Sequence, residues 1–113
     1  MEPPIQDKAL ILRELMIRLA SFYDITDKEA SKLVMDVIHS LEVQALALQK
    51  MSSSPDDPSF KYALNSIMMV VSRLHASHLK RSLKSLTQLN GLSDSLRKHN
   101  IKQFIAFLNS LHM

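Results

Sequence analysis

The stretch RLHASHLKRSLKSL, residues 73–86, decides how the second half of the chain folds. Before it, apolar residues recur at helical spacing: Phe60, Leu64, Ile67, Val71 and Leu74. After it, leucines recur one position out of that register: Leu79, Leu83, Leu86 and Leu89. This shift predicts either one helix of about 33 residues with an irregular turn, or two helices that meet around Ser77.

Two helices are predicted before this stretch. Apolar residues follow the helical period from Ile5 to about Tyr23. Thr26 and Glu29 have the spacing of a capping box, so a second helix is expected from Asp27 to about Met51. The run SSSPDDP, residues 52–58, predicts a loop. Its last two residues, Asp57 and Pro58, are typical of the start of a new helix.

The C-terminal part is expected to hold another helix. Asn90-Gly91 predicts a helix end, with Gly91 in the left-handed conformation. Residues 92–98 are expected to form a short helical segment, and residues 100–103 resemble a second capping box. A final amphipathic helix would then begin just before Phe104.

Composition favours one all-α domain over residues 1–113. There is a single glycine, and hairpin signals are missing, which argues against a sheet. We therefore expect a small bundle of four main helices with long antiparallel helices. Helices of about 25 and 33 residues would span about 38 and 50 Å at 1.5 Å per residue, more than the width of a domain of this size. Dimerisation of two copies is predicted to complete the bundle.

The same composition bounds the environment and the chemistry. The absence of cysteine excludes disulfides and iron–sulfur clusters and fits a reducing compartment. No apolar run reaches the roughly 20 residues that span a bilayer, so no membrane contact and a cytoplasmic location are expected. No catalytic motif, metal-ligand set or cofactor signature is present, and the prediction is a protein that is not an enzyme.

Charge is divided between the two halves. Residues 1–58 hold 6 Lys and Arg against 10 Asp and Glu, whereas residues 59–113 hold 8 against the single Asp94. The second half could form a basic surface of Arg73, Lys80, Arg81, Lys84, Arg97, Lys98 and Lys102. Such a surface would attract nucleic acid or an acidic protein, or the two halves could attract each other.

Two local resemblances bear on function. Residues 7–48, with DKALI at 7–11 and ITDKEASKLV at 25–34, resemble the N-terminal helix pair of HU-type DNA-bending proteins. That family continues with a β-sheet and extended arms that bind DNA, whereas residues after 50 predict helices here, so its DNA-binding residues have no counterparts. The run His78-Leu79-Lys80-Arg81-Ser82 resembles the segment around the phosphorylated histidine of histidine phosphotransfer domains. That resemblance implies a four-helix fold, His78 as the phosphoryl acceptor and a response regulator as partner.

Excess apolar surface supports a third interpretation, which we favour. Several apolar residues lie off the main helical stripes or in a run that covers all sides of a helix: Leu10, Ile11, Ile17, Met68, Met69 and Val70. Side chains of this kind suit contact with another protein, and Met adapts to varied partners. The sequence therefore predicts a non-catalytic protein-interaction module of the regulator, antiactivator, chaperone or adaptor type, with a nucleic-acid-binding regulator as the alternative.

Overall fold

The regular structure is helical throughout the part of the chain that the computed structural model describes. That part is residues 4–86 and 89–112, with side chains for 8–77, 79–86, 89 and 91–112. The α-helices are α1 (Pro4–Tyr23), α2 (Asp27–Lys50), α3 (Pro58–Leu74), α4 (Ser77–Ser82) and α5 (Asp94–Ser110). Two short 3₁₀ segments, η1 (Leu83–Leu86) and η2 (Leu89–Gly91), lie between α4 and α5. The all-α prediction is confirmed.

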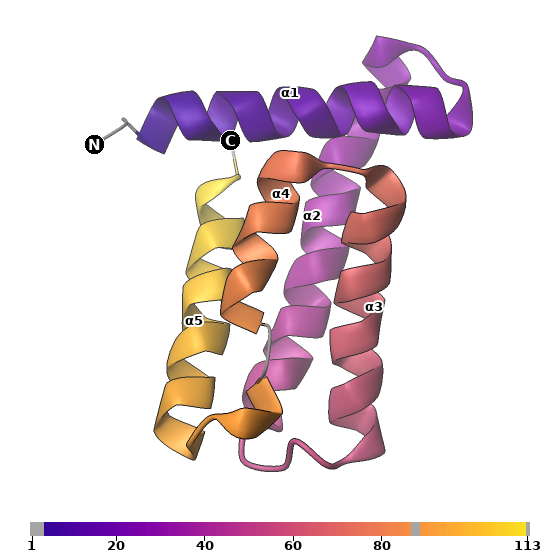
Figure 1. Ribbon diagram of the computed structural model, residues 1–113. Helices are drawn as coiled ribbons and strands as arrows, with labels where there is room; N and C mark the ends of the chain where they lie inside the picture. The colour runs from indigo at the N-terminus through magenta and orange to yellow at the C-terminus, as the bar shows by residue number, and fades with distance from the viewer. Residues whose placement is uncertain (1–3, 87–88, 113) are drawn as a thin grey trace.

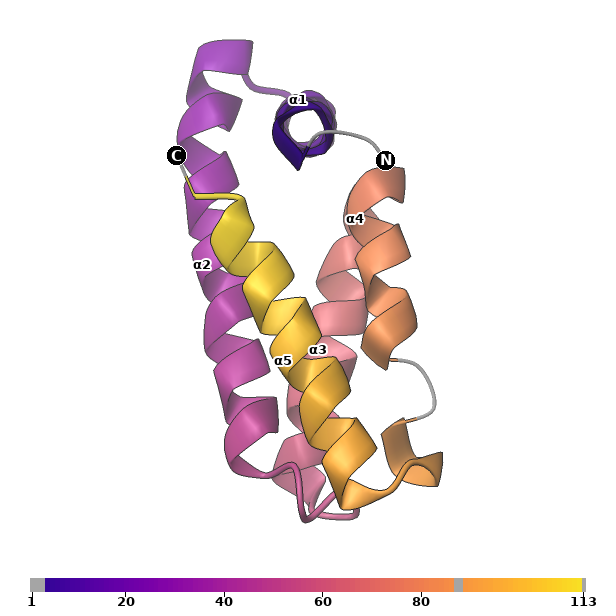
Figure 2. The same cartoon turned by 90° about the vertical axis from the view of Figure 1, so that its left-hand side faces the viewer.

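Helix α2 packs against α1, α3 and α5, and these are the three most extensive contacts between helices. Helices α2, α3, α4 and α5 run alongside one another, and α1 lies across one end of them (Figure 1). The view from the side places α1 between the ends of α2 and α4 (Figure 2). The described residues extend over 43 × 33 × 19 Å, with a radius of gyration of 14.4 Å, which is near the value for a compact chain of this length.

Local signals set the beginnings of α2 and α3. The Thr26 hydroxyl accepts a hydrogen bond from the Glu29 backbone N–H, and the Glu29 carboxylate accepts one from the Thr26 N–H, so the predicted capping box is present. The Asp57 carboxylate accepts from the Ser59 N–H at 2.8 Å, with Pro58 as the first helical residue. One stripe of α2 is buried in the core: Ala30, Val34, Ile38, Leu41, Ala45 and Leu48.

The chain breaks between α3 and α4, so the second of the two predicted alternatives is correct. His75 ends α3 with φ 52° and ψ 33°, a left-handed conformation, and α4 begins at Ser77. The break buries Ala76, and it lets Leu79 and Leu83 turn into the core although they follow a different register from α3. No helix of about 33 residues exists in this region, so this reason for expecting a dimer is removed. Helix α2, with 24 residues, is about 36 Å long and fits within the 43 Å length of the protein.

The start of α5 differs from the prediction. Gly91 lies in η2 without a positive φ, so it is not a left-handed helix end. Helix α5 begins at Asp94, where the Ser93 hydroxyl accepts a hydrogen bond from the Leu96 N–H. The capping box expected at residues 100–103 lies inside this helix and is wrong. Because Ile101 belongs to the stripe that α5 buries, the helix gains more by continuing through Asn100 than by starting there.

The left-handed residue at the break leads to a stability prediction. A side chain with a β-carbon costs about 1–2 kcal/mol in this conformation, a cost that glycine avoids. Glycine also increases the entropy of the unfolded chain, and this effect offsets part of the gain. The net result expected for His75→Gly is a rise of about 0.5–1 kcal/mol in the free energy of unfolding. Urea denaturation would measure the change. His75→Ala, which keeps the β-carbon, is the control and should show no such gain; equal stability of the two variants would contradict the prediction.

Candidate functional site

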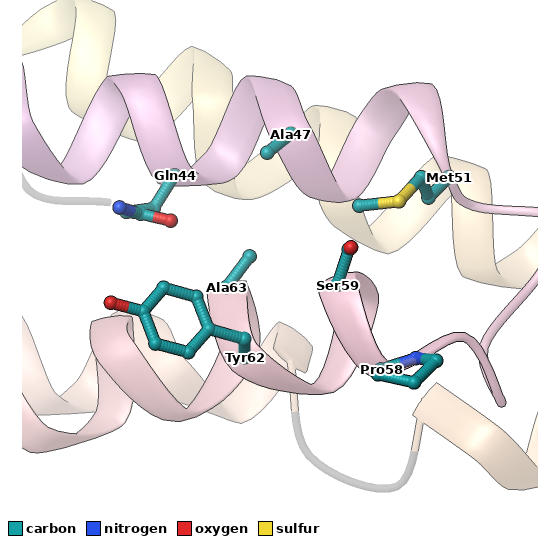
Figure 3. A pocket seen from close by; sticks show the side chains of 7 residues that line it. All are labelled: Gln44, Ala47, Met51, Pro58, Ser59, Tyr62 and Ala63. Atoms are coloured by element: carbon teal, nitrogen blue, oxygen red, sulfur yellow. The ribbon is translucent and has the colours of Figure 1, made fainter.

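Two hollows lie along the same side of α2, facing α3, and together they are called the groove. Its lower part is a hollow of about 530 Å³ near the loop that joins the two helices (Figure 3). Gln44 and Ala47 of α2 and Met51, which directly follows that helix, line one side of this hollow. Helix α3 contributes Pro58, Ser59, Tyr62 and Ala63. Tyr62 is 71 % exposed and lies along the edge of the groove, opposite Gln44. The hollow is therefore accessible to a partner side chain.

The upper part of the groove is a second hollow, of about 410 Å³, where α1 also reaches α2 and α3. Leu19 and Tyr23 come from α1, Val70 comes from α3, and α2 supplies Leu33, Asp36, Val37 and Ser40. Tyr23 is 57 % exposed and packs edge-on against Phe22, with ring centroids 4.9 Å apart. Exposed aromatic rings beside an apolar hollow are typical of protein-binding surfaces.

The two hollows belong to one continuous side of α2. The residues that line them recur at helical spacing along this helix: Leu33, Val37, Ser40, Gln44, Ala47 and Met51. From residue 33 to residue 51 this side spans about 27 Å. Helices α4 and α5 lie on the opposite side of the α2–α3 pair, so neither covers the groove (Figures 1 and 2). A helix of about 18 residues has the same length.

The predicted apolar contact residues are found in three different places. Leu10 and Ile17 are about half exposed on α1 and border a third hollow, of about 350 Å³, together with Arg13, Glu14 and Arg18. Ile11 is only 6 % exposed and belongs to the core, because it shares the inner stripe of α1 with Leu15 and Leu19. Its side chain is therefore not exposed for contact with a partner in this structure.

The run of five apolar residues in α3 is divided between core and surface. Ile67 and Val71 are buried, while Met68 is half-buried against the core. Met69 is 51 % exposed, and half-buried Val70 lines the upper hollow. Of the predicted contact residues, Val70 alone lines the groove.

The predicted basic residues are exposed with one exception. Those at the surface come from α3, α4, η1 and α5: Arg73, Lys80, Arg81, Lys84, Lys98 and Lys102. Lys98 and Lys102 stand one turn apart on α5 and therefore on the same side of it. His78 is the second residue of the six-residue α4. Its side chain is not among those that the structure describes, so its phosphotransfer role stays a prediction.

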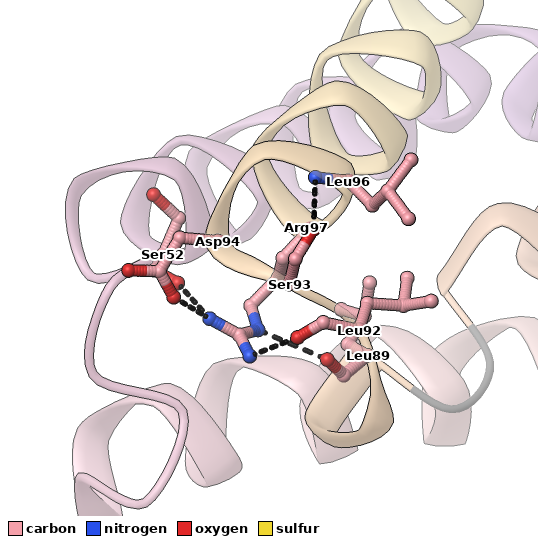
Figure 4. Close-up of polar contacts among 7 residues, drawn as sticks. All are labelled: Ser52, Leu89, Leu92, Ser93, Asp94, Leu96 and Arg97. Atoms are coloured by element: carbon pink, nitrogen blue, oxygen red, sulfur yellow. Dashed lines mark hydrogen bonds and ion pairs between the residues drawn. The ribbon is translucent and has the colours of Figure 1, made fainter.

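Arg97 is the exception, because its side chain is buried and its residue is only 4 % exposed. Its guanidinium donates hydrogen bonds to the carbonyl oxygens of Ser52, Leu89 and Leu92 at 2.7–2.9 Å and to Oδ1 of Asp94 at 2.6 Å (Figure 4). These bonds join the loop after α2 to the segment that leads into α5. The prediction of Arg97 as a surface cation is wrong, and its role is structural.

Two features are absent from the part of the chain that the structure describes, a metal site and a membrane-spanning helix. Among the side chains that the structure describes, no group of three or more from His, Asp and Glu is placed to hold a metal ion. No helix in the described part is long and apolar enough to cross a membrane.

Comparison with known proteins supplies no family, since no family model, curated protein or solved structure matches the chain. Function therefore has to be inferred from the groove and the exposed charges.

Several groove residues were not singled out in the sequence. The helical period of residues 27–51 predicts that Leu33 and Val37 are buried, and it gives no role to Asp36 or Ser40. Tyr62 on α3 carries no signal of this kind. A signal does exist, because residues 33, 37, 40, 44, 47 and 51 form a second helical stripe beside the core stripe. Sequence alone does not distinguish a stripe covered by a neighbouring helix from one that stays half open.

The hydrogen bonds of Arg97 lead to a prediction about stability. Arg97→Leu would leave three inward-facing carbonyl groups without their donor, so we expect a loss of roughly 2–4 kcal/mol in the free energy of unfolding. Thermal and urea denaturation would measure it. The control is Lys98→Leu at the exposed neighbouring position, which should change stability by about 0.5 kcal/mol or less. Similar losses for both variants would contradict a special role for Arg97.

Proposed function

We propose that the chain is a non-catalytic interaction module that binds a helix of a partner protein in the groove between α2 and α3. The observation that carries the proposal is the groove itself, a side of α2 about 27 Å long, half open and mainly apolar. An amphipathic helix that lays its apolar face in such a groove is a common form of peptide recognition. The exposed rings of Tyr23 and Tyr62 support it, since aromatic residues contribute strongly to binding.

Two occupants of the groove fit this proposal, a helix of another protein and a helix of a second copy of the chain. The half-exposed Leu10 and Ile17 of α1 are apolar and keep the homodimer in consideration. Sedimentation equilibrium distinguishes the two occupants. If the chain is a monomer of 12.9 kDa at micromolar concentration, a second copy does not occupy the groove, and another protein is the expected occupant. A species of twice that mass, lost on blocking the groove, assigns the groove to a second copy.

The test of the groove is a substitution that fills it. Ala47 is half-buried in the lower hollow, and Ala47→Arg places a long charged side chain there while keeping a good helix former. We expect at least about a 10-fold loss of partner affinity, equivalent to about 1.4 kcal/mol, because the arginine side chain would occupy the space that the partner helix needs. Isothermal titration with the partner, or with the second copy, would measure the loss.

The matched control is Val43→Arg on the same helix. Val43 is 51 % exposed and lies one turn from Ala47, but it lines neither groove hollow. The partner itself is identified by placing a photo-crosslinking residue at Tyr62, with a second at exposed Leu96 on α5 for comparison. Equal affinity losses for Ala47→Arg and Val43→Arg, or the same crosslinked proteins from both sites, would refute the groove as the binding site.

Nucleic-acid binding is the second candidate function, and the six exposed residues of the predicted basic surface favour it. The single acid of that half, Asp94, is already bonded to Arg97, so it does little to offset them. Phosphate contacts by these side chains would release counterions, which makes affinity fall steeply with salt.

For this candidate the expected result concerns the salt dependence of binding. With a 20-base-pair duplex, the replacement of Lys98 and Lys102 by Gln should lower the slope of log affinity against log salt by roughly 2, about one unit for each phosphate contact. Fluorescence anisotropy at several salt concentrations would measure the slope. A duplex that fails to bind at low salt would eliminate the nucleic-acid candidate without affecting the groove.

A further inference from the structure

One charged side chain stands in the otherwise uncharged groove. Among the residues that line the two groove hollows, Asp36 is the only one with a formal charge. It is exposed, and its carboxylate makes no hydrogen bond or ion pair with another residue in the described part of the chain. An unpaired carboxylate at an apolar recognition surface invites a cation from a partner, because attraction strengthens when the partner excludes water.

The neighbours of Asp36 indicate what kind of cation would fit. The walls of the hollow are aliphatic, formed by Leu19, Leu33, Val37 and Val70, and would contact a methylene stem. The Tyr23 ring offers an aromatic face or edge, and the Ser40 hydroxyl adds an acceptor. Arginine combines an aliphatic stem with a planar guanidinium that binds a carboxylate through two hydrogen bonds and stacks on aromatic rings.

We infer that the partner helix presents an arginine to the upper hollow, with its stem on the aliphatic walls and its guanidinium on the Asp36 carboxylate. This inference rests on the proposed function, since it names the chemistry of the helix that the groove binds. The net negative charge of residues 1–58 also favours a positively charged partner.

Two cations of the chain itself limit the strength of this attraction. Lys32 stands one turn before Asp36 on α2, and Arg73 stands one turn after Val70 on α3. Because both are exposed, solvent screens their effect, and the expected gain is that of a partly exposed pair rather than of a buried one. The arginine should therefore act mainly on selectivity, while the apolar contacts supply most of the affinity.

The experiment uses the full chain and three synthetic helical peptides of 18 residues. The peptides share one apolar face and differ at one central position, which is Arg, Gln or Glu. Fluorescence anisotropy should give the Arg peptide roughly 5- to 10-fold tighter binding than the Gln peptide, and the Glu peptide the weakest binding. Asp36→Asn should abolish the difference between the Arg and Gln peptides and leave the affinity for the Gln peptide unchanged.

The matched control is Asp56→Asn in the loop after α2, an exposed acid that lines neither hollow and should leave the ranking intact. Circular dichroism verifies that each variant is folded. Equal binding of all three peptides, blocked by Ala47→Arg, would overturn the arginine inference and leave the groove proposal standing. Binding that ignores Ala47→Arg, or no binding of any peptide, would overturn both.

Discussion

The buried guanidinium of Arg97 is the interaction on which the lower end of the protein depends. A charge this far from water is stable only when its donors find acceptors, and three backbone carbonyls and the Asp94 carboxylate provide them. One of these acceptors is Ser52, which directly follows Met51 at the lower end of the groove. The same side chain that fixes the start of α5 thus also holds the loop from which α3 departs beside α2. Arg97 thus supports the lower end of the groove although it does not line it.

At the other end, contacts from distant parts of the chain hold α1 in place. Ser77 at the start of α4 donates to the Glu14 carboxylate at 2.8 Å, and Lys8 donates to the backbone oxygen of His112. The His112 ring lies 2.7 Å from the Glu42 carboxylate on α2. These contacts join the acidic first half to the basic second half within one chain. They fix the position of α1, and thereby of Leu19 and Tyr23 in the upper hollow.

Features encoded in a few neighbouring residues could be predicted from the sequence. The capping box at Thr26 and the Asp57-Pro58 start are of this kind, because the side chain and the backbone group that it satisfies lie within three residues. The start of α5 could not be predicted in the same way. Two cap candidates compete there, and Ser93 is selected because the buried stripe of α5 already begins with Arg97. The partners of Arg97 lie up to 45 residues away, and no local pattern reports them.

The arrangement of the helices separates the groove from the exposed cations of α4 and α5. The groove, with its single carboxylate, lies between α2 and α3, while α4 and α5 lie on the other side of that pair and bear four exposed cations, Lys80, Arg81, Lys98 and Lys102. A helix bound in the groove would therefore leave the cations of α4 and α5 uncovered. The apolar contacts of such a helix would change little with salt, whereas phosphate contacts of the opposite side would weaken steeply. The two proposed activities therefore differ in their dependence on salt, and this difference separates them experimentally.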